Sequence, residues 1–306
     1  MKISCLLLTL LIAVQSVFSQ DGSIIKESWD ANPTLHNIPN KLSSESAIVL
    51  RDKRRVEYVD EGKEGLMMYR TLHKIIHVND DKGIEAFNTI YLGVSNSSDI
   101  VDIKARTILP SKKIIEIDRK NIKDIKDEDG SQYKIFALEG LEKGCEVEYY
   151  YTYKAPSTFF GREILQGAFP ISEASIEIVS PERLVFEHRL YNGTESGNAK
   201  DTVLNSKRIS SIQSSNIEGV EEEKYAAYKG NLQRLEYKLS YNLSRSANEK
   251  LFSWNELAKR IYEIYTSFSD KEMKKVQSLV SDNKWDKLGT EKLAVCTLFR
   301  GEEYAV

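Results

Sequence analysis

The sequence contains few of the residues that build metal centres and disulfide frameworks. Its 306 residues include three cysteines and four histidines. His73 and His77 are the closest histidine pair, but in an extended strand they would stand about 13 Å apart, at ~3.3 Å per residue, which is too far to share one metal ion. The acidic stretch from Asp124 to Gly130 lacks the ligand spacing of a calcium loop. We therefore expect no metal or other cofactor, and interpret His73 and His77 as partly exposed strand residues.

Long apolar runs are also scarce, and the clearest one lies at the N-terminus. Lys2 precedes a largely apolar run from Leu6 to Val14, and small or apolar residues continue to Ser19. This pattern predicts a signal peptide over residues 1–19, because the run is shorter than the ~20 residues of a membrane-spanning helix. We expect export to the periplasm or cell surface, with no transmembrane segment after cleavage. The net charge of -3 indicates no basic surface for nucleic acid.

Proline is rare and unevenly distributed. All six prolines lie between Pro33 and Pro181, together with most runs of alternating apolar and polar residues. Proline interrupts helices, so this part is expected to be β-structured. We predict a mainly β protein, with an antiparallel β-sandwich over residues 44–247 and a short α-helical tail over residues 248–306. Residues 20–43 are polar and aperiodic, which predicts an extended or loosely packed lead-in.

Alternation between apolar and polar residues defines the expected strands. They span residues 47–59, 66–78, 84–94, 100–109, 113–118, 133–138, 145–153, 174–179, 184–191, 208–213 and 232–241. Turn-forming residues at 79–83 predict a hairpin between the second and third of these strands. In the strand at 145–153, Val147 and Tyr149 are expected to face the core, and Glu146 and Glu148 a solvated face.

The residue period changes at Ser253. Ser253 and Glu256 have the spacing of a capping box, so a helix is expected to begin there. Trp254, Leu257 and Ile261 then recur at helical spacing. Further helices are predicted over residues 271–281 and 291–300.

Several short motifs in the chain resemble a known family. They are Phe136-Ala137-Leu138-Glu139-Gly140-Leu141-Glu142-Lys143-Gly144, Glu146-Val147-Glu148-Tyr149-Tyr150, Phe159-Phe160-Gly161-Arg162-Glu163, Leu165-Gln166, Pro170-Ile171 and Ser180-Pro181. Over residues 44–241 the chain resembles the domain of unknown function 3857 family. This exported bacterial β-domain precedes a transglutaminase-like domain, whose opening helix the Ser253-Trp254 segment resembles.

The resemblance implies that the chain ends before the catalytic Cys, His and Asp of such a domain, so we expect no enzyme activity. Cys296 lies within an apolar helical pattern and is interpreted as a small buried residue. Glu146 and Glu148 would stand ~7 Å apart on one strand face, as in an inverting glycosidase. Alternate glutamates are, however, also common on solvated strand faces.

One segment is rich in aromatic residues. Residues 155–169 show no strand alternation, and Phe159, Phe160 and Phe169 occur there beside Arg162. We predict a binding loop formed by these four residues, although a loop folded over the end of the sandwich would explain the same pattern.

Three functions fit these observations. The favoured one is a non-catalytic exported module that binds or positions a peptide, protein or glycan, or acts beside a transglutaminase-like domain. The alternatives are a free-standing peptide- or glycan-binding protein of the periplasm or surface, and a hydrolase that uses Glu146 and Glu148 or a thiol.

Overall fold

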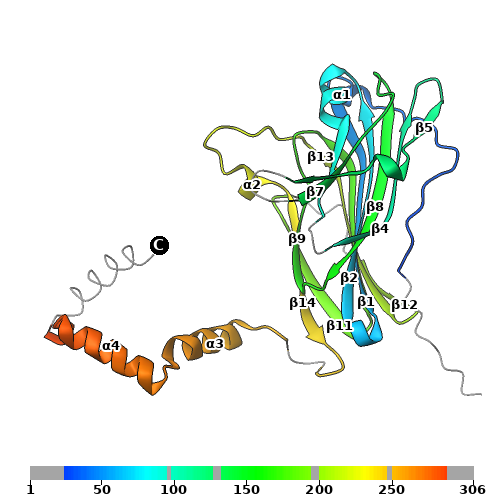
Figure 1. The fold of residues 1–306 in the computed structure, drawn as a ribbon. Helices are drawn as coiled ribbons and strands as arrows, with labels where there is room; N and C mark the ends of the chain where they lie inside the picture. The colour runs from blue at the N-terminus through cyan, green and yellow to red at the C-terminus, as the bar shows by residue number, and fades with distance from the viewer. Residues whose placement is uncertain (1–23, 95–97, 127–131, 194–199, 247–249, 288–306) are drawn as a thin grey trace, which may run out of the picture. The chain divides into compact units, whose positions relative to one another are not determined.

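A computed structural model describes residues 24–94, 98–126, 132–193, 200–246 and 250–287. The chain divides into two compact units, residues 1–249 and 250–306. It is mainly β, as the alternation predicts, and its strands belong to the first unit (Figure 1). The predicted signal peptide, the predicted helix over 291–300 and Cys296 lie outside the described residues.

Eight strands form the large sheet of the first unit. In spatial order they are β12 (Lys200–Leu204), β13 (Lys207–Ile217), β10 (Ile171–Pro181), β1 (Ala47–Asp60), β2 (Leu66–Val78), β8 (Glu146–Pro156), β4 (Asp99–Ile108) and β5 (Ile114–Glu116). Neighbouring strands are antiparallel except β1 and β10, which are parallel. The prediction of a purely antiparallel architecture is therefore wrong at this pair.

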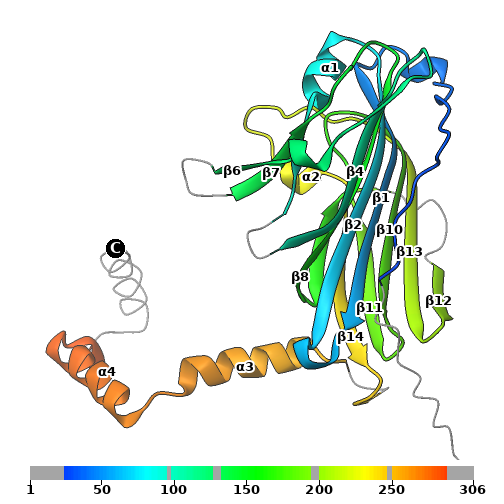
Figure 2. The ribbon, with the colours of Figure 1, turned by 45° about the vertical axis from the view of Figure 1, so that its right-hand side comes forward.

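Two three-stranded sheets pack against one face of the large sheet, here called the packed face (Figure 2). One contains β11 (Leu184–Tyr191), β14 (Arg234–Asn242) and β9 (Phe160–Ile164), and the other β3 (Thr89–Leu92), β7 (Gln132–Ala137) and β6 (Lys123–Lys126). The Tyr58 and Phe186 rings stack at 4.6 Å, and the Phe136 and Tyr149 rings meet at 6.1 Å. These contacts join each small sheet to a strand of the large one.

The opposite face of the large sheet carries the lead-in, so we call it the lead-in face (Figure 1). Residues 24–39 run across it without helix or strand, as expected, and a short 3-10 turn η1 (Asn40–Leu42) leads into β1. The segment is not loosely packed, because Glu27 is buried and hydrogen bonds to the sheet recur along it.

Two local predictions fail for identifiable reasons. The expected hairpin at residues 79–83 is instead the start of helix α1 (Asp81–Phe87), because the side chain of Asp80 accepts a hydrogen bond from the backbone nitrogen of Gly83. The segment at 155–169 contains β9, whose pairing with β14 supplies the strand that its sequence does not reveal. β6 and β12 were also not predicted. The remaining short helices are η2 (Gly62–Glu64), η3 (Arg119–Asn121) and α2 (Tyr228–Asn231).

The described part of the second unit contains α3 (Trp254–Thr266), α4 (Asp270–Asp282) and the 3-10 turn η4 (Trp285–Lys287). The predicted cap is present, since Ser253 Oγ accepts from the Glu256 nitrogen at 3.1 Å. No residue of α3 or α4 is buried. Within the described residues, no helix has both the length and the apolar character needed to cross a bilayer.

Candidate functional site

Charged side chains from the central strands of the large sheet are buried beneath the lead-in. Glu146 and Glu148 on β8 are 0% and 4% exposed, and His73 on β2 is 4% exposed. The interpretation of these glutamates as solvated, and of His73 and His77 as partly exposed, is therefore wrong. The alternation is correct, but the lead-in covers the second face, so both faces of β8 are buried.

His73 links the lead-in to the sheet. Its Nδ1 lies 3.1 Å from Glu27 Oε1 in the lead-in, and its Nε2 lies 2.9 Å from Glu148 Oε1. An ionised carboxylate can only accept hydrogen bonds, so both ring nitrogens must donate and the ring is an imidazolium. Burial alone would lower the pKa of His73, but the hydrogen bonds to Glu148 and Glu27 outweigh it and raise that pKa.

Glu27 attaches the lead-in to the sheet through several ion pairs. Besides His73, it contacts Lys53 Nζ at 3.0 Å and Arg55 at 3.3 Å on β1. Burial disfavours its charged form, yet hydrogen bonds from His73 and Lys53 and the charge of Arg55 lower the pKa of Glu27 to about 2. A buried carboxylate is tolerated only with such compensation.

Arg106 on β4 holds the next residues of the lead-in. Its Nε donates to Glu148 Oε2 at 2.8 Å, and its terminal nitrogen donates to the backbone carbonyl of Asp30 at 2.7 Å. The Trp29 ring lies 4.2 Å from the guanidinium carbon and meets the Tyr150 ring edge-on at 5.4 Å. Arg106 thus holds residues 29 and 30 of the lead-in against the sheet by a hydrogen bond and a cation–π contact, while Glu148 compensates its buried charge.

A second imidazole–carboxylate cluster surrounds Glu146. The backbone nitrogen of His36 donates to Glu146 Oε1 at 2.7 Å, and His36 Nδ1 lies 2.8 Å from Oε2. His77 Nδ1 is 3.5 Å from Oε1, and no hydrogen-bond partner satisfies it among the described residues. Burial alone would raise the pKa of Glu146, but the nearby His77 ring and the hydrogen bonds from His36 lower it.

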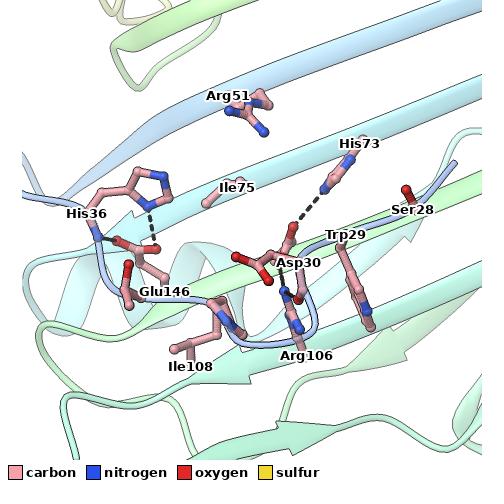
Figure 3. Close-up of a pocket in the computed structure, with 13 residues that line it drawn as sticks. Ser28, Trp29, Asp30, His36, Arg51, His73, Ile75, Arg106, Ile108 and Glu146 are labelled. Carbon is pink, nitrogen blue, oxygen red and sulfur yellow. Dashed lines mark hydrogen bonds and ion pairs between the residues drawn. The ribbon is translucent and has the colours of Figure 1, made fainter. Parts of the chain in front are cut away.

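A cavity of about 500 Å³ lies between the lead-in and the sheet (Figure 3). From the clusters above, the lining includes Trp29, His36, His73, Arg106, Glu146 and Glu148. Arg51, Ile75 and Ile108 from the sheet and Ser28 and Asp30 from the lead-in also line it. Among the residues that the structure describes, no three histidine, cysteine or acidic side chains are arranged to hold a metal ion.

Burial alone would also raise the pKa of Glu148, but hydrogen bonds from His73 and Arg106 lower it. Hydrogen bonding therefore favours the ionised form of both glutamates of the suspected glycosidase pair. Glycoside hydrolysis requires one carboxylic acid with a raised pKa to protonate the leaving group. Neither glutamate of this pair has a raised pKa.

The four residues of the predicted binding loop occupy different places. Phe160 is 74% exposed on β9, and Arg162, two residues further on, forms an ion pair with Glu236 at 2.9 Å. Phe159 is 40% exposed just before β9. Phe169 lies apart from them, with its ring 5.1 Å from the Phe87 ring of α1.

The motif around Phe160 has a structural reason in β9. A Cβ atom on Gly161 would lie 2.2 Å from the hydroxyl oxygen of Tyr237 on β14, so the strand pair requires glycine. Glu163 is buried and pairs with Arg54 at 3.2 Å and with Arg70. The motif therefore fixes how β9 covers the packed face.

Sequence reasoning missed Glu27, Trp29 and Arg106 as site residues. The lead-in has no periodicity, and isolated charges on strands usually indicate a solvated face. The available signal was charge at central strand positions, including Lys53, Arg55 and Arg106, which becomes informative only once the strand order is known.

The first unit is thus built on a mixed β-sheet, and an N-terminal segment covers the charged side chains on one face of its central strands. The chain belongs to the DUF3857 family, a domain of unknown function with solved structures, whose model matches residues 67–221. This confirms the resemblance seen in the motifs. A comparison with curated proteins finds no match.

A solved structure shows a related fold. A candidate protease from Parabacteroides distasonis aligns with a TM-score of 0.56 and 14% identity over 80% of this chain and 51% of that protein. An M1 zinc metallopeptidase variant from Deinococcus radiodurans aligns with a TM-score of 0.35 and 7% identity over 64% of this chain and 43% of that protein. The first likeness concerns the fold alone, and the chain spans about half the length of that protein.

Proposed function

We propose that this chain is a non-catalytic, exported β-sandwich module that binds and positions a ligand on its lead-in face. The observation that carries the proposal is the cavity of about 500 Å³, whose histidines and glutamates already bind one another. Its volume lies in the range of ligand pockets, roughly 300–1,000 Å³. The motif resemblance adds a transglutaminase-like domain as the partner beside which such a module acts.

The state of the charged groups supports binding in preference to catalysis. A general acid or base needs a pKa near the working pH and a free site for the proton that it transfers. Glu146 and Glu148 have lowered pKa values, and both ring nitrogens of His73 are occupied by carboxylates. These groups stabilise the lead-in by binding one another. They line the cavity without offering a group that is free to transfer a proton.

The sandwich and export parts of the proposal have separate support. The small sheets pack on one face of the large sheet through Tyr58–Phe186 and Phe136–Tyr149, as layers of a sandwich do. The Lys2, Leu6 to Val14 and Ser19 pattern supports export to the periplasm or cell surface. N-terminal sequencing of the exported protein should begin at Gln20, and recovery of a membrane-bound form that retains Lys2 would contradict export.

A second candidate surface lies on β9. Phe160 is largely exposed beside Arg162, and aromatic and arginine side chains are enriched in protein interfaces. This observation favours peptide or glycan binding by the free-standing protein. Phe160→Ala should abolish such binding and leave ligands of the cavity unaffected.

The experiment that tests the proposal combines turnover with binding. The purified protein is incubated with peptide, amide and glycoside substrates, and its ¹⁵N amide spectrum is recorded with panels of short peptides and oligosaccharides. We expect no turnover, and saturable shifts confined to amides of residues 28–36 and their strand neighbours. Turnover that disappears in Glu146→Gln or Glu148→Gln would establish the hydrolase alternative, and the absence of any binding would refute the binding role.

A further inference from the structure

Two charged side chains that line the cavity have no ionic partner within the described part of the chain. They are Arg51 on β1 and Asp30 in the lead-in. The other charged lining residues are paired: His36 with Glu146, and His73 and Arg106 with Glu148. Among the described residues, Asp30 Oδ1 accepts a hydrogen bond only from the backbone nitrogen of Asn32, two residues further on, at 2.9 Å. Both side chains are exposed to solvent, and Arg51 lies opposite Glu173 of β10 in the strand register. The cavity therefore presents one cation and one anion that form no ion pair among the described residues.

The position of Arg51 results from an irregularity in the sheet. The pairing of β1 with β2 shifts register between Val49 and Arg51, so that Val49 lies opposite Ile76 and Arg51 opposite Ile75. Without this bulge, Val49 and Arg51 would share one face. The bulge directs Val49 to the packed face and Arg51 to the cavity, where Figure 3 shows its side chain above Ile75. Bulges commonly redirect side chains in this way beside functional sites.

We propose that the cavity binds a small zwitterion, a free amino acid or dipeptide, with its carboxylate on Arg51 and its ammonium group on Asp30. This inference rests on the proposed binding function and names the ligand class. The planar guanidinium matches a carboxylate through two parallel hydrogen bonds. Ile75 and Ile108 supply apolar lining for a side chain.

The surrounding charges select a zwitterion over a phosphate. The guanidinium fork would bind either anion. The lining also contains Asp30, which forms no ion pair among the described residues and repels a dianion more strongly than a single carboxylate, whereas Glu146 and Glu148 are already paired with histidine and arginine. Asp30, in turn, is repelled by a phosphate but attracts an ammonium group.

The test uses the dipeptide L-alanyl-L-leucine, its C-terminal amide, its N-acetyl form and inorganic phosphate. Affinity is measured by calorimetry and by amide shifts for the wild type, Arg51→Gln, Asp30→Asn and the control Arg119→Gln, an exposed arginine outside the cavity. Thermal unfolding checks that each variant remains folded. We expect the free dipeptide to shift amides of residues 28–36, and Arg51→Gln to weaken its binding about 10- to 100-fold, as for a charged hydrogen bond.

Removing a charge from the ligand should make the loss of its proposed partner in the protein irrelevant to binding. The amide should bind wild type and Arg51→Gln equally weakly, and the N-acetyl form should bind wild type and Asp30→Asn equally. Unchanged dipeptide affinity in Arg51→Gln, tighter binding of phosphate than of dipeptide, or no binding of the dipeptide overturns the inference. If other peptides or oligosaccharides still shift the cavity amides, the binding function survives without this ligand class.

Discussion

The two faces of the large sheet are both buried along its central strands, but by opposite chemistry. The packed face is covered by two small sheets through apolar and aromatic side chains, interrupted by one ion cluster that includes Asp52, Arg54 and Glu163. The lead-in face is covered by a single extended segment through imidazolium–carboxylate and arginine–carboxylate pairs. Apolar packing has little directionality, whereas buried charges require defined partners. The lead-in face can therefore be covered only by a segment that places matching charged and hydrogen-bonding groups opposite its buried charges, whereas the packed face requires mainly apolar surface.

The largest expected effect comes from removing one partner of a buried charge pair. Glu148→Ala leaves Arg106 and His73 without their common carboxylate, and should destabilise the protein by about 3–5 kcal/mol. Urea unfolding measures this change. Glu116→Ala, on the exposed part of β5, is the matched control and should change stability by no more than about 0.5 kcal/mol. Equal effects at both positions would show that the charged face contributes no specific stability.

Acid should weaken the lead-in through Glu27. Its folded pKa of about 2 lies below the ordinary value of 4.5. Its contribution is therefore present above pH 4.5, and is lost as the pH falls towards 2. The loss should reach about 3 kcal/mol, at ~1.4 kcal/mol per unit of pKa. Urea unfolding between pH 2 and 6 should show a shallower decline in Glu27→Gln than in wild type. An identical decline would assign the acid sensitivity to other carboxylates.

Alkali should weaken the same contact through His73, by a smaller amount. The pKa of His73 is raised, so its contribution is complete below its ordinary value of 6.5 and disappears as the pH rises through the folded value. Hydrogen exchange, corrected for the intrinsic pH dependence, should show that the opening free energy of residues 25–36 falls with pH while that of β1 changes less. In His73→Gln this difference should vanish, even though the variant is less stable at every pH.

The smallest effect is expected on the packed face. Ile76 is fully buried there, and Ile76→Val removes one methylene group. It should cost about 0.5–1.5 kcal/mol, with no effect on the pH dependence described above. A loss as large as that of Glu148→Ala would mean that the packed face is the less tolerant of the two, contrary to the comparison. Urea unfolding at pH 5 and at pH 8 measures both the loss of stability and its dependence on pH.

Much of the fold could be predicted from local patterns. The strand at Leu66–Val78 was predicted with the bounds observed, and the helix at Trp254 begins at its predicted cap. These successes depend on interactions between residues near in sequence. The hairpin at 79–83 failed because one side chain, Asp80, caps a helix where the residue types favour a turn. β9 was missed because only its pairing with β14 makes residues 160–164 a strand.

The sequence by itself determined the mainly β architecture, the alternation of β8 and the helical period after Ser253, since each depends on contacts within one segment. Only the tertiary structure decided that Glu146, Glu148 and His73 are buried, because their cover comes from the lead-in, with Glu27 and His36 46 and 110 residues away from their partners. Whether a strand face is exposed to solvent depends on which other segments of the folded chain cover it. The bulge at Arg51 and the cavity beneath the lead-in arise for the same reason.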